Sequence, residues 1–169
     1  MEIRKANKTD KDGIQALMDE LNTYRQNTFS FENKKFHERT NPYPPLEDSI
    51  FDENFFFIAI DDDSRIVGFI QGSIHQRKNH KLSKLGYLDK LFVKSEFRRK
   101  GIAKSLFSEL ESEFRKQGCN HMTTHTDAEN ELSQQFYLLH PRYSVEGTLH
   151  HPQYGHKMSL ACPFSFEHM

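Results

Sequence analysis

Apolar residues recur along this chain with two different periods, one of about four residues and one of two, and these periods predict its elements. The longer period within residues 11–25 predicts an N-terminal helix, which Thr9 or Asp10 can cap. It returns within residues 101–116, where a second helix is predicted, and Gly118 is suited to end that helix. The apolar stripe of this second helix consists of Ile102, Leu106, Leu110 and Phe114.

Runs of β-branched and aromatic residues predict strands between and after these helices. The sequences NFFFIAI (residues 54–60) and IVGFIQGSIH (residues 66–75) flank the polar turn DDDSR, which is typical of an antiparallel hairpin. The largely apolar run LGYLDKLFV (residues 85–93) predicts a central strand. Further strands are expected at MEIRKA, CNHMTTHT, YSVEG and HKMSLA, and a last helix at NELSQQFYLL, before Pro141.

The order of these elements predicts a mixed α/β (α+β) fold. Residues 24–50 include the sequence NPYPPLEDS, whose prolines forbid a regular element, so we expect a short helix and an irregular loop that is free to shape a pocket. The order β-α-(α)-β-β-β-α-β-α-β-β predicts a mixed sheet with helices on both faces. A chain of 169 residues without a repeat or linker is expected to form one domain, residues 1–169.

The composition of the chain argues against two classes of binding partner, nucleic acids and membranes. The formal net charge is −1, whereas nucleic-acid-binding surfaces are basic, so no nucleic acid partner is expected. No apolar run has the length that crosses a membrane, and the N-terminus lacks the apolar core of a secretory signal. Cys119 and Cys162 form no C-x-x-C motif and suit a reducing compartment. We therefore expect a cytoplasmic protein without a membrane partner.

The junction between the strand at residues 85–93 and the next helix is a candidate anion site. The first N–H groups of a helix have no partner within it, the helix dipole adds positive charge there, and a glycine lets an anion approach the backbone. The basic residues around Gly101 are Arg98, Arg99, Lys100 and Lys104. A bound polyphosphate would relieve their conflict with the dipole, and a solvated basic turn is the alternative. The P-loop and dinucleotide-binding glycine motifs are both absent.

Three segments, in the correct order, resemble one family. The sequence RRKGIA (residues 98–103) matches the [QR]-x-x-G-x-[GA] signature of GCN5-related N-acetyltransferases, the GNAT family. YLDKLFVKSEF resembles the fourth strand of that family, and DAENELSQQFY resembles its later N-x-x-[AS]-x-x-[FL]-Y segment. The resemblance covers essentially the whole chain and is strongest between Tyr87 and Tyr137. It implies a mostly antiparallel sheet of six to seven strands that splays between strands four and five.

The resemblance also implies a cofactor, acetyl-coenzyme A, and no metal. In the family, N–H groups of the signature loop hold the pyrophosphate, which agrees with the anion site argued above. The corresponding positions are Arg98, Arg99, Lys100, Gly101, Ile102, Ala103 and Lys104. Backbone groups of the fourth strand bind the pantetheine arm and the acetyl carbonyl, as an oxyanion donor does, and here belong to Leu91, Phe92 and Val93. Asn130 matches a position whose side chain reaches the pantetheine.

Tyr137 and Asp89 match the catalytic positions of the family. Tyr137 matches a tyrosine that protonates the departing thiolate, although an aromatic core face is the alternative for this position. Asp89 takes the place of a glutamate base and, being shorter, is expected to act through water. Strand alternation predicts that Tyr87, Asp89, Leu91 and Val93 share one face. The alternative role of Asp89 is a surface charge that pairs with Lys90 or with a cross-strand partner.

One departure from the family pattern follows Tyr137. Family members continue with a Gly-Phe pair, whereas this chain has LLHPRYSVEG, in which Tyr143 is a candidate for the phenylalanine. The register of the last helical turn, and with it the direction of Tyr137, is therefore open.

The histidines are better explained as scattered surface residues than as a metal site. The sequence HMTTH has helical ligand spacing but lacks the glutamate of H-E-x-x-H, and as a strand it places His121, Thr123 and His125 on one face. His125 lies near the expected splay, where it could contact substrate or relay a proton. The late sequence LHHPQYGH is expected to be a loop, either a pocket edge or a plain hairpin.

We expect an N-acetyltransferase that transfers acetyl to a primary amine of a small molecule or peptide. Direct attack in a ternary complex is favoured because no residue is placed as a nucleophile with an orienting base. An aromatic segment, residues 24–36, suits a cationic small molecule, as do four acidic residues, Glu47, Asp48, Asp52 and Glu53. The alternatives are a non-catalytic coenzyme A-binding regulatory module and a nucleotide or phosphoprotein binder. A homodimer is conceivable, but the sequence indicates no interface.

Overall fold

The protein is described by a computed structural model for residues 1–28, 45–76, 78, 84–127, 129–139, 144–151 and 155–163, with the last two ranges described by their backbone and by the Ala161 side chain. The helices and strands are β1 (Glu2–Lys5), α1 (Lys11–Thr28), α3 (Ile50–Glu53), β2 (Phe55–Ile60), β3 (Ile66–Gln76), β4 (Lys84–Val93), α4 (Ile102–Lys116), β5 (His121–Asp127), α5 (Glu131–Leu138), β6 (Ser144–His151) and β7 (Gly155–Pro163). Short 3₁₀ turns, Lys8–Asp10 and Ser95–Phe97, precede α1 and follow β4.

The strands form one sheet in the order β1-β2-β3-β4-β5-β7-β6. Strands β4 and β5 run parallel, and every other neighbouring pair is antiparallel. These pairings confirm the predicted mixed, mostly antiparallel sheet, with seven strands, and the hairpin predicted around DDDSR is formed by β2 and β3.

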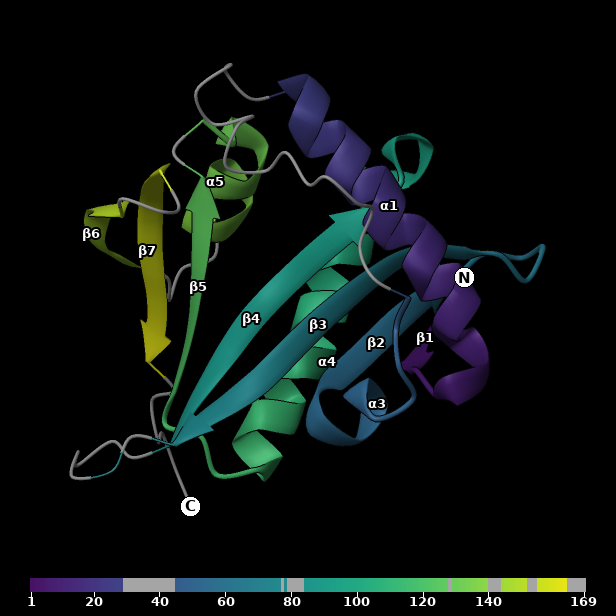
Figure 1. Ribbon diagram of the computed structural model, residues 1–169, viewed down its shortest axis with the longest axis horizontal. Coiled ribbons are helices and arrows are strands. Elements are labelled where there is room, and N and C mark those ends of the chain that lie inside the picture. The colour runs from purple at the N-terminus through teal and green to yellow at the C-terminus, as the bar shows by residue number, and fades with distance from the viewer. Residues whose placement is uncertain are drawn as a thin grey trace.

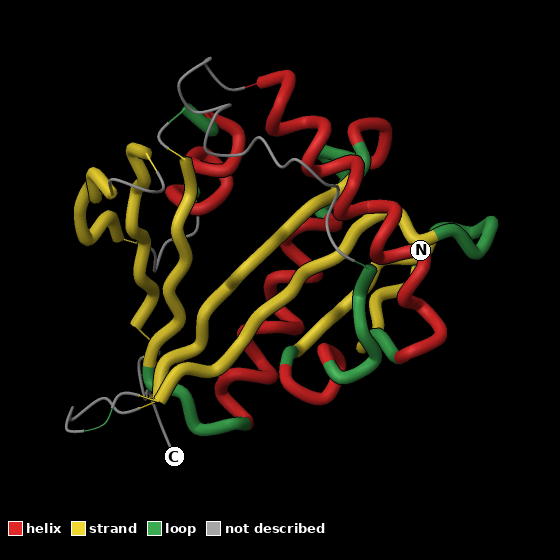
Figure 2. Tube along the Cα trace, in the orientation of Figure 1, coloured by secondary structure: helices red, strands yellow, loops and turns green. Residues whose placement is uncertain are grey.

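The sheet is split between its two parallel strands. The pairing of β4 with β5 begins at Leu85 and His121 and ends at Leu88 and Thr124. Beyond these residues the strands diverge toward their carboxyl ends, as Figures 1 and 2 show. The splay that the family resemblance implied is therefore present. We call the V-shaped opening beyond Leu88 and Thr124 the split.

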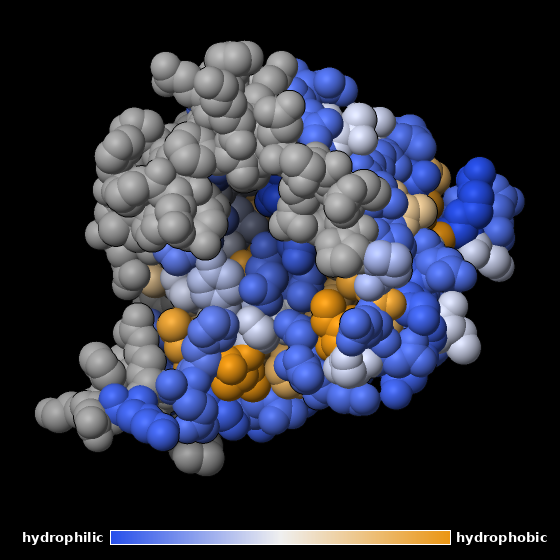
Figure 3. Space-filling view, in the orientation of Figure 1, coloured by the Kyte–Doolittle hydropathy of each residue, from blue (hydrophilic) through white to orange (hydrophobic). Residues whose placement is uncertain are grey.

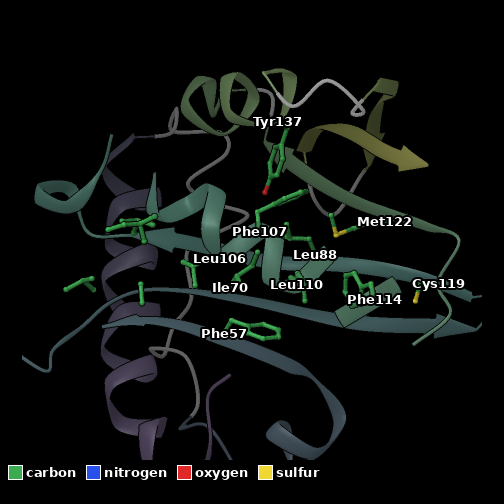
Figure 4. Close-up of a cluster of buried hydrophobic side chains, with 14 residues drawn as sticks. Phe57, Ile70, Leu88, Leu106, Phe107, Leu110, Phe114, Cys119, Met122 and Tyr137 are labelled. Atoms are coloured by element: carbon green, nitrogen blue, oxygen red, sulfur yellow. The ribbon is translucent and has the colours of Figure 1, made fainter. Parts of the chain in front are cut away.

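The two faces of the sheet are covered by different helices (Figure 1). On one face, the α1 face, the buried residues of helix and strands are Ile14, Leu17, Met18, Leu21, Phe56, Ile58, Phe69 and Phe92. On the other, the α4 face, they include Phe57, Ile70, Leu88, Leu106, Phe107, Leu110, Phe114 and Met122 (Figure 4). The predicted stripe of α4 is buried along its whole length, which confirms both the helix and the two-sided covering.

Helix α4 lies very close to the sheet because two facing strand positions lack a side chain. A Cβ atom added to Gly86 would come within 2.4 Å of the Phe114 ring, and one added to Gly72 within 2.6 Å. At the end of the helix, Gly118 adopts φ 76°, and the next amide, of Cys119, donates to the Phe114 carbonyl at 2.9 Å. Gly118 thus ends the helix as predicted.

Three details differ from the sequence-based expectations. The N-terminal cap is Asn7, one turn before α1, because its side chain accepts from the Thr9 amide at 2.8 Å while the Asp10 carboxylate accepts from the Asn7 amide at 2.9 Å. The short helix expected within residues 24–50 is in part an extension of α1 to Thr28 and in part α3, and residues 29–44 lie outside the described ones.

The third difference concerns LHHPQYGH, which was expected to be a loop. Strand β6 runs to His151 and β7 begins at Gly155, because the hairpin pairs His150 with His156 and His151 with Gly155. Residues 152–154 lie outside the described part of the chain, as do Pro141 and Tyr143.

Candidate active site

The loop that begins α4 has the backbone geometry of an anion-binding site. Gly101 is the N-cap with φ 79°, and Arg99, two residues earlier, also has a positive φ of 62°. A Cβ atom at Gly101 would meet nothing within 4 Å, so the space in front of this helix end is open. No side chain caps the helix and its first turn contains no acidic residue. The amides at this end are therefore suited to bind an anion from outside.

The basic side chains of this loop fall into two groups. Arg99, Lys100 and Lys104 are exposed, and within the described residues none of them forms an ion pair; the Lys100 ammonium lies 5.1 Å from the centre of the Phe97 ring. Arg98 points to the α1 face instead, where its Nε donates to the Val93 carbonyl at 2.9 Å. Its guanidinium lies 5.1 Å from the centre of the Tyr24 ring. The Arg98 side chain thus contributes to the packing between β4 and α1, and its predicted cofactor role stays a prediction.

The three strand residues predicted to bind cofactor lie along the edge of the split. Leu91 and Val93 pack into the α4-face core, and Phe92 packs into the α1-face core. Because their side chains are occupied in this way, any ligand in the split would meet their backbone. This matches the predicted backbone role, which stays a prediction. The Val93 carbonyl already accepts the Arg98 hydrogen bond.

Asp89 lies in a β-bulge, and this corrects the predicted alternation. Strand β3 residues Gln71 and Gly72 pair with Lys90 and Leu88, so Asp89 is an extra residue with no partner across the ladder. Leu88 and Leu91 both belong to the α4 face, and two residues lie between them instead of one. The prediction of one shared face is therefore wrong in part: Tyr87 and Asp89 lie on the α1 face, whereas Leu91 and Val93 lie on the α4 face, since the bulge shifts the alternation by one residue.

The bulge places the Asp89 carboxyl group on the α1 face, next to residues of β3. Burial raises the pKa of this carboxyl above its ordinary value, against the opposing effects of a hydrogen bond from Ser73 and the nearby Lys90 and His75. Its Oδ2 is buried and has no hydrogen-bond partner among the described residues. The alternative of a charge that pairs with Lys90 or a cross-strand partner is in part confirmed, because the Lys90 charge and the Ser73 hydrogen bond both lower the pKa of this carboxyl, although the carboxyl is buried and Lys90 also donates to Gln71 Oε1 at 2.8 Å.

A tyrosine–histidine pair stands beside Asp89 on the same face. The Tyr87 hydroxyl and His125 Nδ1 are 2.5 Å apart, and the two ring centroids are 5.5 Å apart. Burial, together with the nearby Asp89 charge, raises the pKa of Tyr87 to about 12. Tyr87 is therefore a neutral phenol at physiological pH. The pair joins β4 to β5 at the position where they begin to separate.

Tyr137 reaches the same position from the opposite face. It lies on α5, is 5% exposed, and is part of the α4-face core, with its hydroxyl directed toward the sheet (Figure 4). Burial raises its pKa to about 12, opposed by a hydrogen bond with Thr124 and the nearby Arg25 charge. Thr124 Oγ1 in turn donates to the Leu88 carbonyl at 3.0 Å. Thr124 and Leu88 are the last paired residues before the split, so the phenol lies at its vertex.

Asn130 caps α5, and a cavity opens next to it. Its side-chain oxygen accepts from the Ser133 amide at 3.2 Å, which is a structural role beside the predicted contact with pantetheine. The cavity has a volume of about 380 Å³ and lies between the end of α1 and the start of α5; its described lining is Tyr24, Thr28, Glu129, Asn130, Glu131, Leu132 and Gln135. In Figure 3 the α1 face is hollowed near its centre, where the described residues are mainly hydrophilic.

Two features of this site could not be read from the sequence. One is the bulge, because it depends on how β3 pairs with β4. The other is the contact set at the vertex, formed by Thr124 with Tyr137 and by Tyr87 with His125. Period-two spacing places Tyr87 and His125 on a strand face but does not indicate that they meet.

The described residues include neither a cluster of metal ligands nor a membrane-spanning helix. They contain no group of three or more His, Cys, Asp or Glu side chains arranged to hold a metal ion. None of the helices among them is both long and apolar enough to cross a membrane.

Comparison with known proteins agrees with this geometry. The sequence model of the acetyltransferase (GNAT) family matches residues 14–140, and the chain belongs to that family. The comparison with curated proteins gives no match.

Solved structures share the fold over nearly the whole chain. A chain of the NatC complex bound to Gag peptide and CoA is 19% identical, with a TM-score of 0.66 and coverage of 98% of this chain and 100% of that one. The paiA N-acetyltransferase of Thermoplasma acidophilum in complex with coenzyme A is 20% identical, with a TM-score of 0.73 and coverage of 96% and 98%. The ribosomal-protein-alanine N-acetyltransferase of Brucella melitensis is 18% identical, with a TM-score of 0.74 and coverage of 97% and 100%.

Proposed function

We propose that this protein transfers the acetyl group of acetyl-coenzyme A to a primary amine, by direct attack in a ternary complex. The observation that carries the proposal is the arrangement around the split. The Tyr137 phenol reaches the vertex from the α4 face, and the buried Asp89 carboxylate lies beyond the vertex on the α1 face. An open anion-binding helix end lies at Gly101, at the start of α4.

The coenzyme would be bound mainly by backbone groups. Its pyrophosphate would be held by the amides from Arg99 to Lys104, with the exposed basic side chains of the loop contributing charge. The pantetheine arm would then follow the edge of β4 beside Leu91, Phe92 and Val93. An amide of this edge would donate to the acetyl carbonyl and stabilise the oxyanion of the tetrahedral intermediate. The NatC and paiA structures, which share the fold, contain coenzyme A.

Tyr137 would protonate the departing sulfur. Its pKa of about 12 keeps the phenol protonated at every physiological pH, so it is ready to donate as negative charge develops on the thiolate. The nearby Arg25 charge lowers the phenol pKa and so assists the transfer. Because Tyr137 lies on the α4 face, the sulfur would leave toward the side opposite the incoming amine.

Asp89 would receive the proton that the amine must lose before attack. A carboxylate whose pKa is raised by burial is a stronger base than an exposed one. Its Oδ2 is buried and has no hydrogen-bond partner among the described residues, so, because aspartate is also short, it would receive the proton through a bridging water molecule. The amine would thus give one proton to Asp89 and form the new C–N bond. The C–S bond would then break as the sulfur takes the proton of Tyr137, the nitrogen would lose its second proton to water, and Tyr137 would regain a proton from water, which leaves a neutral amide and a thiol.

The acceptor we propose is a primary amine of a small molecule or a peptide, and cationic acceptors fit best. The cavity at the end of α1 contains Tyr24 and two carboxylates, of Glu129 and Glu131, which favour a positively charged molecule. We assign the reaction to the cytoplasm because the cysteine content suits a reducing compartment.

The test is calorimetric titration with acetyl-coenzyme A, followed by thiol release with a panel of amines that includes polyamines, aminoglycosides and peptides with a free N-terminus. The proposal expects binding of acetyl-coenzyme A and release of thiol with at least one amine. Tight binding without release from any amine would instead identify a non-catalytic coenzyme A-binding module. Equal competition by ATP would identify a general nucleotide binder.

A further inference from the structure

Three aromatic side chains form a row across β3, β4 and β5 on the α1 face. The Tyr87 ring lies between His75 and His125, with ring centroids 5.5 Å from each. Among the described residues, the Tyr87 hydroxyl forms its hydrogen bond with His125, at a distance of 2.5 Å from Nδ1, and not with His75. Tyr87 is therefore held in place on both sides, and it in turn fixes the orientation of the His125 ring.

His125 lies at the position on β5 where the split begins. His125 directly follows Thr124, the last residue of β5 that pairs with β4. Thr124 belongs to the hydrogen-bonded group of Tyr137 on the α4 face, and His125, as the next residue of a strand, points to the opposite face. Tyr137, the proposed acid, and His125 thus lie at the vertex of the split on opposite faces of the sheet.

The hydrogen bond to Tyr87 constrains which nitrogen of His125 can accept a proton or a hydrogen bond. In a neutral imidazole one nitrogen donates and the other accepts. When Nδ1–H donates to the Tyr87 oxygen, Nε2 carries the lone pair. Tyr87 can take this role because its pKa of about 12 keeps it neutral, and a neutral hydroxyl both accepts and donates hydrogen bonds.

We propose that His125 contacts the acceptor directly, with Nε2 accepting a hydrogen bond from the attacking amine while Tyr87 fixes the ring. The inference rests on the proposed transferase function and deepens it. The ammonium group gives one proton to Asp89, a second N–H donates to Nε2, and the lone pair so formed is held toward the acetyl carbonyl. His125 neither gains nor loses a proton in this step. Tyr87 is a positioning residue that acts through His125.

Two substitutions of His125 separate this role from a structural one. Asparagine places its amide near the position of Nδ1 and preserves contact with Tyr87, whereas glutamine places its amide near Nε2. If Nε2 contacts the amine, His125→Asn lowers kcat/KM for the amine by about 10- to 100-fold, the loss expected for one hydrogen bond to a polar substrate group. His125→Gln keeps kcat/KM within about fivefold of wild type, and Tyr87→Phe falls between the two.

The controls use a second histidine of the same strand. His121 lies four residues earlier, on the same strand face. His121→Asn and His121→Gln therefore introduce the same substitutions at a position that is not proposed to contact the acceptor. Both controls are expected to keep the wild-type kcat/KM. The dissociation constant of acetyl-coenzyme A, measured by calorimetry, should be unchanged in all five variants, because His125 lies on the face away from Gly101.

The outcomes of this test are distinguishable from failure of the proposed function. Absence of turnover by the wild-type protein with every amine would refute the transferase itself. Turnover by wild type together with a His125→Asn variant as active as His125→Gln, or more active, would overturn the assignment of Nε2 and leave the transferase standing. A loss confined to the KM of acetyl-coenzyme A would likewise overturn it.

Discussion

The two faces of the sheet next to the split have opposite chemistry, although the same strands build both. The α4 face is dry and closely packed, with Phe114 and Leu110 fully buried beside Gly72 and Phe114 also beside Gly86. The α1 face near Asp89, Tyr87 and His125 carries titratable groups in a half-buried setting. Strand alternation makes this separation possible, because neighbouring residues of one strand serve different faces.

Next to the split, the residues that stabilise the fold and the residues proposed for catalysis therefore lie on opposite faces of the same sheet. They meet only at the vertex, where Thr124 interacts with Tyr137 on one side and His125 follows on the other. Substitutions in the packed part of the α4 face should therefore mainly change the free energy of unfolding, and those next to the split on the α1 face should mainly change turnover, with both effects expected at the vertex.

Phe114→Ala should be the most damaging change to stability. The ring is fully buried, is 5.9 Å from the Phe55 ring in an edge-on contact, and fills the space left by two glycines. Its removal should lower the free energy of unfolding by about 3–5 kcal/mol, measured by urea denaturation. The matched change on the α1 face is His75→Gln, an exposed site, for which a change within about 0.5 kcal/mol is expected. Similar losses for both variants would contradict the division.

Tyr137→Phe should slow turnover strongly while leaving the coenzyme bound. Loss of a proton donor to the leaving sulfur should lower kcat by about 100-fold. The dissociation constant of acetyl-coenzyme A should not change, because the phenol lies at the vertex and not at the α4 loop. Since the pKa of Tyr137 is about 12, the wild-type kcat should show no decline from this group below about pH 11. Normal turnover by the variant would show that another group protonates the sulfur.

Asp89→Asn should lower kcat/KM for the amine by about 10- to 30-fold and change its pH dependence. The reaction requires the ionised carboxylate, and burial raises its pKa, so wild-type activity should fall with decreasing pH above the ordinary aspartate range. The variant should lack this acidic decline. An unchanged acidic decline in Asp89→Asn would assign it to a different group.

The same substitution should affect stability in the opposite direction. A carboxyl whose pKa is raised in the folded state opposes folding once it is ionised, so this penalty is absent below the unfolded-state pKa and grows as the pH rises through the folded-state pKa. Asp89→Asn should therefore raise the free energy of unfolding at neutral pH and leave it nearly unchanged at low pH. Such a gain on losing a functional residue is typical of active sites.

Gly101→Ala should give the smallest effect, and Gly118→Ala is its matched control. Both glycines have a positive φ, 79° and 76°, both would add a Cβ into open space, and they lie at opposite ends of α4. Each change should cost about 1 kcal/mol of stability from backbone strain. Only Gly101→Ala should weaken acetyl-coenzyme A binding, by about fivefold, because only this Cβ would meet the pyrophosphate. Equal binding by both variants would place the coenzyme elsewhere.

Much of the architecture was predictable from local patterns. The stripe of α4 follows from its four-residue period, the central strand at residues 85–93 from its apolar run, and the helix stop from Gly118. The cap of α1 was less predictable, because Thr9, Asp10 and Asn7 all have suitable side chains, and the choice of Asn7 depends on the Arg4–Asp10 ion pair at 2.7 Å. That pair joins β1 to the turn six residues later.

Most helices and strands, the open helix end at Gly101 and the family of the chain could be predicted from the sequence, since these depend on residues close together along the chain. Only the tertiary structure decided which face Asp89 occupies, and that Tyr87 meets His125 and Tyr137 meets Thr124. The physical reason is strand register. A single extra residue in β4 reverses the direction of every side chain beyond it, and that residue is extra only with respect to β3, whose residues beside the bulge, Gln71 and Gly72, lie 18 and 17 positions earlier in the chain.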